Sequence, residues 1–460
     1  MTESEQDTNQ GSIRDRRFEP LAGGGEPGRA SGLGTRRGLW LLFLAALGLR
    51  LALMFVLDSS ARAESGVAWE WGWETACVAE TLVEGDAYGD PWGKGTGPSA
   101  WLTPVYPALV AACMSLGGGV TPMAATLLFS VHAIISALTC LLLVALGRTL
   151  GLSRVGLAAG WVFALYPAAL WNAVTNVWDT TLVGFAVTFF FVLLLRAPGR
   201  SGGRIGNRAA GQVGLAFGAL LMINPAPLGL LPAALAFVAL RSEPGARVAR
   251  AAAFLGAALL VCSPWVIRNL SVLGTPNLRS NLGVEFHVGN NDLANGRHQT
   301  AYHPSHSESE LALYRDLGEV AYARASMQSA LDWMREHPGR TGRLILRRMQ
   351  IFWVGESPVN DPRTTGSTRA AEDPKAWIKW AFHSVSGLLA IVAIFSFRRR
   401  TAEGTLIRTA LLFFPVPYYL THVMERYRFP MDPLLVFLDV WVVLWLVERW
   451  RTSRKLDAGA

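Results

Sequence analysis

Long apolar runs separated by short polar segments recur along the chain from Gly38 nearly to its C-terminal end. A helix needs about 20 apolar residues to cross a bilayer, and open sheets cannot replace such helices because unpaired backbone groups are costly in lipid. The pattern predicts an all-α polytopic membrane protein with about ten transmembrane helices. We expect these crossings at approximately 38–57, 123–148, 155–173, 178–196, 209–224, 226–241, 250–267, 378–397, 405–424 and 433–449.

Arginine-rich segments lie between alternate pairs of these runs, most visibly in RAPGRSGGRIGNR, FRRR and ERWRTSRK. Because cytoplasmic loops carry an excess of Lys and Arg, both termini are predicted to be cytoplasmic. Residues 1–35 contain too few apolar side chains to fold alone and are expected to form a disordered tail. Residues 36–450 form the expected membrane domain and 451–460 a cytoplasmic tail. A signal peptide is the alternative for the first run, which is long for one and lacks a clean cleavage site.

The same threading leaves two long segments outside the membrane, at 58–122 and 269–376. In the first outer loop, TPVYPALVAACMSLGG is apolar but short, so it is expected to be an interfacial or half-inserted helix. In the second, a helical pattern from Glu310 to Glu336 precedes RLILRRMQIFW, a basic amphipathic stretch expected to lie on the outer leaflet.

Composition agrees with a membrane protein and narrows its partners. The 460 residues are 51% hydrophobic and include 17 Trp, and the mean hydropathy is +0.29, more apolar than a soluble enzyme of this length. The net charge of +8 is spread over short clusters between apolar runs instead of one soluble face, so no nucleic-acid partner is expected. The four cysteines are scattered and predict no disulfide framework or zinc site.

Carboxylates at the outer side of the membrane are the first candidates for chemistry. Glu70 and Glu74 are four residues apart in AWEWGWETACVAETLVEG, which places both on one face of a helix. Asp179 lies near the outer end of the fourth apolar run. A charged side chain there costs free energy, so its presence favours a functional role. A helix N-cap is the structural alternative for Asp179. Trp71 and Trp73, beside the acids, either stack on a sugar or anchor the loop at the interface.

Three arginines are predicted on the outer side of the membrane, where the positive-inside rule expects few basic residues. They are Arg268 in SPWVIRN and Arg426 and Arg428 in HVMERYRFP. The planar guanidinium group matches the geometry of phosphate oxygens, which favours binding of a donor phosphate. The alternative is that these side chains extend to the lipid headgroups. Arg50, inside the first run, is expected to pair with an acid or a phosphate or to reach the interface.

Histidines give a weaker signal. His298, His303 and His306 cluster in the second outer loop, with spacings that make metal binding a minority interpretation. His422 is expected one turn before Arg426 on the same helix face, as a ligand contact or a core hydrogen bond.

These motifs together resemble the GT-C superfamily of polytopic glycosyltransferases, and specifically bacterial members similar to family 39. That family includes protein O-mannosyltransferases and is related to aminoarabinose and rhizobial lipopolysaccharide sugar transferases. The resemblance is carried by WETACVAETLVEG, WLTPVYPALVAACMSLGG, NVWDTTLVGFAVTFFFVLLLR, SPWVIRN and RYRFPMDP. Two positions depart from the family pattern: Trp71-Gly72 stands where the family usually has Asp, and Trp101-Leu102-Thr103 where a basic residue is common.

The resemblance implies an enzyme in the bacterial plasma membrane that moves a hexose or pentose from a polyprenyl-phosphate donor to an extracytoplasmic hydroxyl. The acceptor would be a glycolipid, a polysaccharide or a protein. Glu74, or alternatively Glu70, would be the general base, and Asp179 would orient the acceptor or a divalent cation. The other implied roles are donor phosphate binding by Arg268, Arg426, Arg428 and Lys94, and a substrate pocket formed by Trp71, Trp73, Tyr106 and His422.

Two other functions compete with transfer. A lipid-linked sugar flippase would use similar arginines without needing a base, and a structural membrane protein would need no shared site. The sequence leaves the sugar, the acceptor, any metal requirement and the oligomeric state open.

Overall fold

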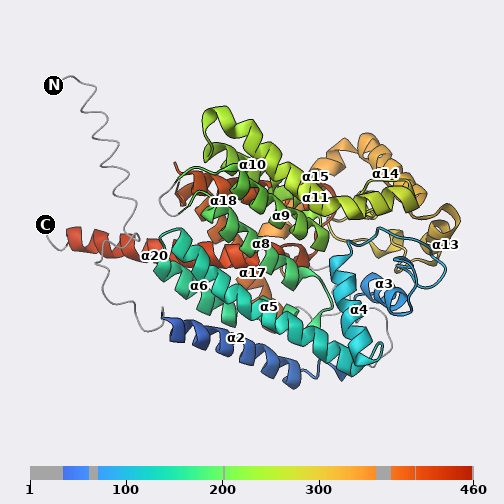
Figure 1. Ribbon diagram of the computed structural model, residues 1–460, viewed down its shortest axis with the longest axis horizontal. Helices are drawn as coiled ribbons and strands as arrows, with labels where there is room; N and C mark the ends of the chain where they lie inside the picture. Colours follow the sequence, from blue (N-terminus) through green and yellow to red (C-terminus); the bar gives the residue numbers. More distant parts are fainter. Residues whose placement is uncertain (1–34, 62–70, 200–202, 359–373, 399, 458–460) are drawn as a thin grey trace.

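The computed structural model describes residues 35–61, 71–199, 203–358, 374–398 and 400–457. Within these ranges the protein is all-helical, as the sequence predicts. Beta pairing there is limited to isolated bridges between Gly89 and Pro98 and between Pro91 and Gly93. The helices form an elongated bundle from which the C-terminal helix α20 projects at one end (Figure 1).

Five helices in the described ranges are long and apolar enough to cross a membrane, which makes the chain a multi-pass membrane protein. They are α2 (Arg36–Val56), α5 (Pro122–Thr149), α11 (Arg247–Leu273), α17 (Pro374–Ser396) and α20 (Asp432–Asp457).

A sixth candidate span is broken. Helices α6 (Ser153–Leu165) and α7 (Pro167–Thr175) meet at an angle of 50°. Pro167 has no backbone N–H and disfavours a helical residue before it, so the bend falls where the proline stands.

The remaining predicted crossings are helical but shorter than a span. They are α8 (Thr180–Arg196), α9 (Asn207–Ile223), and η4 (Ala226–Leu230) with α10 (Leu231–Leu240). The prediction of one continuous helix over 405–424 is wrong. Helix α18 (Ala402–Phe413) stops before Pro415, and only the short α19 (Val416–Leu420) follows. Two prolines within three residues remove the backbone donors that a continuous helix needs.

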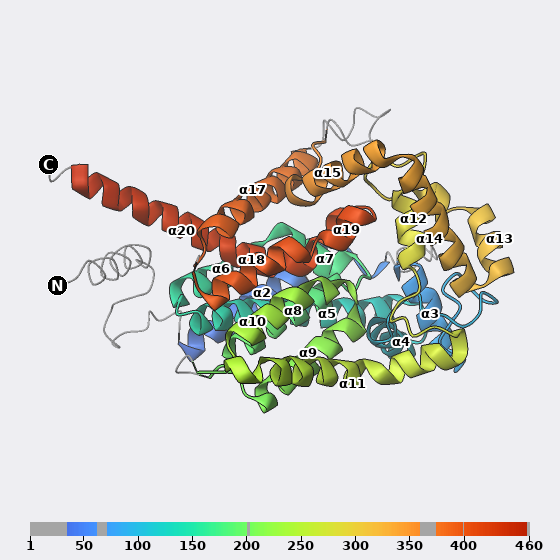
Figure 2. The same ribbon diagram turned by 90° about the horizontal axis from the view of Figure 1, so that it is seen from above.

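Glycines allow close helix packing in the bundle. An added Cβ at Gly214 of α9 would lie 2.1 Å from the carbonyl oxygen of Phe254, and one at Gly218 would lie 2.6 Å from that of Ala258. The two glycines are four residues apart and therefore share one helix face. Helices α9 and α11 run side by side along the bundle (Figure 2) because this glycine face lets their backbones touch.

Arg50 of α2 is fully buried, and its partners differ from those expected. Its Nε donates to Ser136 Oγ at 2.8 Å, and its terminal nitrogens donate to the carbonyls of Ala46, Ala164 and Phe163. The expectation of an acid, a phosphate or the interface is therefore wrong. Two of the carbonyls precede the break at Pro167. Pro167 cannot supply the helical donor to the Phe163 carbonyl, which accepts from the Tyr166 N–H at 3.2 Å and from Arg50 instead.

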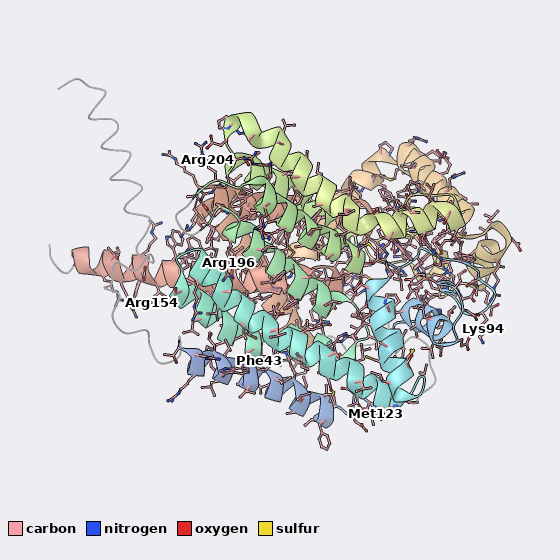
Figure 3. The ribbon with its side chains drawn as sticks, viewed as in Figure 1. Phe43, Lys94, Met123, Arg154, Arg196 and Arg204 are labelled. Carbon is pink, nitrogen blue, oxygen red and sulfur yellow. The ribbon has the colours of Figure 1, made fainter. Side chains whose placement is uncertain are left out.

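Both outer loops gather at the end of the bundle opposite α20 (Figures 1 and 2). The first contributes α3 (Glu74–Val83) and α4 (Val105–Gly117), and the second contributes α12 (Leu282–Gly289), α13 (Glu308–Leu317) and α14 (Glu319–Glu336). Arg154, Arg196 and Arg204 lie at the other end (Figure 3). That this end faces the cytoplasm stays a prediction.

The amphipathic stretch in the second outer loop forms α15 (Pro338–Val354). Its Arg348 is fully buried and donates to the backbone carbonyls of Gly289, Tyr419 and Leu420. This arginine therefore ties α12 to the segment after α18 instead of facing lipid headgroups. The position of α15 relative to the membrane surface stays a prediction.

Candidate functional site

The N-termini of α3 and α8 meet at a glycine. An added Cβ on Gly72 would lie 2.4 Å from the carbonyl oxygen of Val177, and Gly72 has a φ of +75°. Trp71 and Val177 are both about 2% exposed and pack in one hydrophobic cluster. Trp73 has a φ of +35°, a strained value for a residue with a side chain. This tight turn joins the segment that carries Glu74 to the one that carries Asp179, about a hundred residues further along the chain.

Asp179 is the N-cap residue of α8, but its side chain makes no capping hydrogen bond. Instead, Oδ2 accepts a hydrogen bond from Asn224 Nδ2 at 2.7 Å. The Asn224 side-chain oxygen in turn accepts from the backbone N–H of Ala226 at 2.8 Å, which fixes the amide orientation. Asp179 therefore occupies the N-cap position, as the structural alternative expected. Its side chain does not cap the helix and is bound to Asn224 instead.

A third carboxylate, Glu285 of α12, joins these two. Its side chain is 25% exposed and accepts from Asn281 Nδ2 at 2.9 Å. Burial raises the pKa of Glu285 to about 7, with Arg279 opposing the shift and Glu74 adding to it. Burial also raises the pKa of Glu74 above its usual value, and the nearby Arg426 and Arg279 oppose that shift. Sequence reasoning missed Glu285, because a lone acid in a polar loop carries no distinguishing pattern.

Two guanidinium groups lie within electrostatic range of all three acids. Arg279 and Arg426 each interact with Glu74, Asp179 and Glu285. Only Arg426 was a sequence candidate. Its guanidinium lies 4.5 Å from the ring centroid of Trp178, the residue before Asp179. The geometry thus places cationic groups beside acids that come from three distant parts of the chain.

Arg279 is held by the first outer loop. Its Nε donates to the carbonyl of Trp101 at 2.7 Å. The next residue, Ser280, donates its hydroxyl to Glu319 at 2.6 Å, and Glu319 also accepts from the backbone N–H of Ala100 at 2.7 Å. Glu319 is 5% exposed, so these charge-assisted hydrogen bonds join the two outer loops in a water-poor setting.

Arg268 is also committed to the first outer loop. It donates to the carbonyl of Ser99 at 2.7 Å and to that of Tyr88 at 2.5 Å, and it lies over the ring of Trp265. These contacts give Arg268 a structural function. The sequence had assigned it to donor phosphate binding, and nothing in its contacts supports that role.

Two other predicted phosphate ligands are engaged elsewhere. Arg428 is 2% exposed, pairs with Asp432 at 3.2 Å and donates to the carbonyl of His383 at 2.8 Å. Lys94 is exposed and pairs with Glu84 at 2.9 Å, on the outside of the loop end (Figure 3). Neither side chain joins the three acids.

The predicted substrate-pocket residues are mostly buried. Tyr106 is 3% exposed and stacks on His132, with a distance of 3.2 Å between Tyr106 Oη and His132 Nε2. Trp71 is buried as described above, and Trp73 packs partly against the cluster around Trp92. None of the three is carried into the proposal below. Glu70 lies outside the described residues.

His422 was expected on a helix with Arg426, and that expectation is wrong. Residues 421–424 form a loop, and Arg426 lies in the 3₁₀ turn η7 (Glu425–Tyr427). His422 is nevertheless at the site, because its Nε2 lies 2.7 Å from Tyr427 Oη and 3.6 Å from Glu285 Oε2.

The histidine cluster predicted in the second outer loop does form in space. The ring centroid of His298 lies 5.1 Å from that of His303, 6.4 Å from that of His306 and 4.9 Å from that of His422. In the part of the chain that the structure describes, no group of three or more His, Cys, Asp or Glu side chains is arranged to hold a metal ion.

Comparison with known proteins adds a partial likeness. No protein-family model and no curated protein matches the sequence. The oligosaccharyltransferase of Archaeoglobus fulgidus in complex with Zn and sulfate aligns with 90% of this chain and 49% of its own, at 13% identity and a TM-score of 0.47. The same enzyme tethered to an acceptor peptide with the NVT sequon aligns with 88% of this chain and 50% of its own, at 12% identity and a TM-score of 0.47.

A third structure, the archaeal oligosaccharyltransferase AglB from the same organism with an inhibitory peptide and a dolichol-phosphate, has a TM-score of 0.44. It aligns with 89% of this chain and 52% of its own, at 13% identity. The chain thus spans about half the length of these solved structures. Likeness at this level carries no inference about activity, so the function is inferred from the site itself.

The arrangement suits acid–base chemistry on an anionic substrate. A carboxylate with a raised pKa is a stronger base than an ordinary one and can take a proton from a hydroxyl. Guanidinium groups held by fixed hydrogen bonds stabilise negative charge that develops on a leaving group. Glu74, Asp179 and Glu285 offer the first capability, and Arg279 and Arg426 offer the second.

Proposed function

We propose that the protein is a membrane glycosyltransferase that moves a sugar from a polyprenyl-phosphate donor to an acceptor hydroxyl on the extracytoplasmic side. The observation that carries this proposal is the convergence of Glu74 and Asp179 with Arg279 and Arg426. The motifs that resemble the GT-C superfamily support the same function. The donor sugar would be a hexose or a pentose, and the acceptor a glycolipid, a polysaccharide or a protein.

Glu74 serves as the general base. It accepts the proton of the acceptor hydroxyl while the hydroxyl oxygen attacks the anomeric carbon of the sugar. The bond between that carbon and the phosphate oxygen breaks, and its electron pair leaves with the polyprenyl phosphate. Attack opposite the leaving group inverts the sugar configuration. Base catalysis of this kind typically contributes about 10²- to 10⁴-fold.

Arg426 and Arg279 stabilise the departing phosphate. Both guanidinium groups are anchored before substrate arrives, Arg426 on the face of Trp178 and Arg279 on the carbonyl of Trp101. Such preorganised charge is most effective where water is scarce. Arg279 takes the place that the sequence had assigned to Arg268 and Arg428, whose guanidinium groups are occupied.

Asp179 orients the acceptor hydroxyl, or a divalent cation bound with the substrate. Its Oδ2 accepts from Asn224, so one oxygen is held in place by the protein. Glu285 contributes negative charge at the same site. The enzyme would act in a bacterial plasma membrane with both termini in the cytoplasm.

The test is release of polyprenyl phosphate by the purified full-length protein in lipid nanodiscs. The probes are polyprenyl-phosphate mannose, glucose and arabinose, with water or deletion-strain membrane extract as the acceptor, and the product is measured by mass spectrometry. Glu74→Gln and Asp179→Asn are each expected to reduce release at least about 10²-fold. Glu80→Gln is the matched control, because Glu80 is an exposed acid on the same helix.

Retention of activity by Glu74→Gln and Asp179→Asn would contradict the transferase mechanism. A flippase predicts a different result: no polyprenyl phosphate is released, but the sugar headgroup becomes accessible on the opposite side of a proteoliposome. That movement would be unaffected by the two carboxylate substitutions.

A further inference from the structure

Glu319, the first residue of α14, is a buried carboxylate that the transfer mechanism above does not use. It accepts four hydrogen bonds, which come from both outer loops. Its Oε1 accepts from the Ala100 N–H at 2.7 Å and from Ser280 Oγ at 2.6 Å. Its Oε2 accepts from Ser99 Oγ at 2.5 Å and from Tyr314 Oη at 2.9 Å. These bonds offset the cost of burying the carboxylate.

The peptide group between Ser99 and Ala100 is hydrogen-bonded on both sides. Its N–H donates to Glu319, and its carbonyl accepts from Arg268 Nη1 at 2.7 Å. Ser99 and Ala100 are fully buried, so water cannot readily replace either bond. A carboxylate and a guanidinium group therefore fix this part of the first outer loop from opposite sides of one peptide plane.

The next two carbonyls of the same segment hold Arg279 and Ser280. The Ala100 carbonyl accepts from the Ser280 N–H at 3.0 Å, and the Trp101 carbonyl accepts from Arg279 Nε at 2.7 Å. Glu319 completes this junction, because one of its oxygens binds both the Ala100 N–H and the Ser280 hydroxyl. The position of the Arg279 guanidinium group therefore depends on a segment that Glu319 holds.

We propose that Glu319 is a positioning residue for Arg279 and controls stabilisation of the leaving phosphate without touching the substrate. This inference rests on the proposed function. Loss of the carboxylate weakens the junction between Ala100 and Ser280, so the guanidinium group is no longer held in one place. A preorganised charge stabilises the transition state only where it is held. A misplacement of about 1 Å at a catalytic group can cost about 10²-fold in rate.

The experiment is a double-mutant cycle in the nanodisc assay. It compares wild type, Glu319→Gln, Arg279→Gln and the double variant, and the probe is the polyprenyl-phosphate sugar that gives Glu74-dependent release. Glutamine keeps the size of Glu319 but replaces one acceptor oxygen with a donor. Glu319→Gln is expected to lower release about tenfold in the wild-type background. In the Arg279→Gln background the further loss should be less than about twofold, because no guanidinium group remains to be positioned.

Glu310→Gln is the matched control. Glu310 lies on the neighbouring α13 and accepts from Tyr322 Oη at 2.7 Å, much as Glu319 accepts from Tyr314. Its hydrogen bonds within the described residues do not reach residues 99–101 or Ser280. Release by Glu310→Gln should equal wild type in the first background and Arg279→Gln in the second. Its thermal midpoint shows what losing a tyrosine–carboxylate bond does to folding alone.

An equal loss from Glu319→Gln in both backgrounds would overturn the positioning role and leave the transferase in place. Wild-type release by Glu319→Gln or by Arg279→Gln would do the same. If Glu319→Gln does not insert into the membrane, the cycle is decided with Ser280→Ala, which removes a single bond to Glu319. Its loss should be about threefold and should disappear in the Arg279→Gln background. If Glu74→Gln keeps release, the proposed function fails, and this inference with it.

Discussion

Gly72 and Val177 are in such close contact that the backbone of one leaves no room for a side chain on the other. A Cβ at position 72 would lie 2.4 Å from the Val177 carbonyl oxygen. Glu74 is two residues after Gly72, and Asp179 is two residues after Val177. This backbone contact therefore joins the two segments that carry the carboxylates.

Gly72→Ala is expected to weaken both folding and transfer. The new methyl group collides with the carbonyl, and the residue keeps a φ of +75° that disfavours a side chain. Overpacking and backbone strain each cost about 1–3 kcal/mol. We expect a lower thermal midpoint in detergent and a loss of Glu74-dependent release.

Gly85→Ala separates the two causes. Gly85 has a φ of +83°, but an added Cβ there meets no atom within 4 Å. It should show the cost of strain alone, with release close to wild type. Equal effects of the two substitutions on release would mean that the contact with Val177 does not position the acids.

Arg279→Gln is expected to lower release on the order of 10²-fold, as removal of a preorganised charge stabiliser typically does. Arg279→Lys should lose less, because it keeps the charge but not the planar fork. Rates of polyprenyl phosphate release at saturating donor measure this. Arg335→Gln is the control, since Arg335 is an exposed arginine of the same outer loop, paired with Asp332. Wild-type rates in Arg279→Gln would show that Arg279 does not contribute to transfer.

Glu285 predicts a pH-dependent stability. Its folded-state pKa of about 7 lies above the ordinary value of 4.5, so the folded protein binds more protons than the unfolded chain between these pH values. Stability from this group is present below pH 4.5 and is lost as the pH rises through 7. The shift corresponds to a cost of about 3 kcal/mol at pH 8.

Glu285→Gln removes that cost. The variant is expected to raise the thermal midpoint in detergent at pH 8 and to change it much less at pH 5. Both midpoints are measured at the same detergent and salt concentrations. A variant that is destabilised equally at the two pH values would show that the carboxylate is not desolvated.

Arg50→Met is expected to destabilise the membrane domain by about 1–3 kcal/mol. Methionine fills much of the volume but removes the hydrogen bonds that Arg50 donates to Ser136 and to the carbonyls of Ala164 and Phe163. The thermal midpoint measures the loss, and Arg154→Met, an exposed arginine of α6, should leave it unchanged. An unchanged thermal midpoint in Arg50→Met would mean that the free-energy cost of burying the guanidinium equals the stabilisation from its hydrogen bonds.

The membrane class and the helical nature of the chain follow from the sequence, because burial in lipid selects apolar residues over every long helix. Asp179 is also a candidate from the sequence, since an acid at the edge of an apolar run stands out from its neighbours. Glu74 is a candidate because it shares a helix face with Glu70. The break within 405–424 was missed, although Pro415 and Pro417 mark it, because hydrophobic content alone does not separate a span from two shorter pieces.

The tertiary structure decides which charged groups remain available for a substrate. Arg268, Arg279 and Arg428 look alike along the chain. Arg268 is bound to the carbonyl of Ser99 and Arg428 to Asp432, whereas Arg279 lies within electrostatic range of Asp179. The sequence shows that a residue is charged and how far it lies from the nearest apolar run. The carbonyls that hold Arg268 and Arg279 come from segments more than a hundred residues away, and only folding brings them within hydrogen-bonding distance.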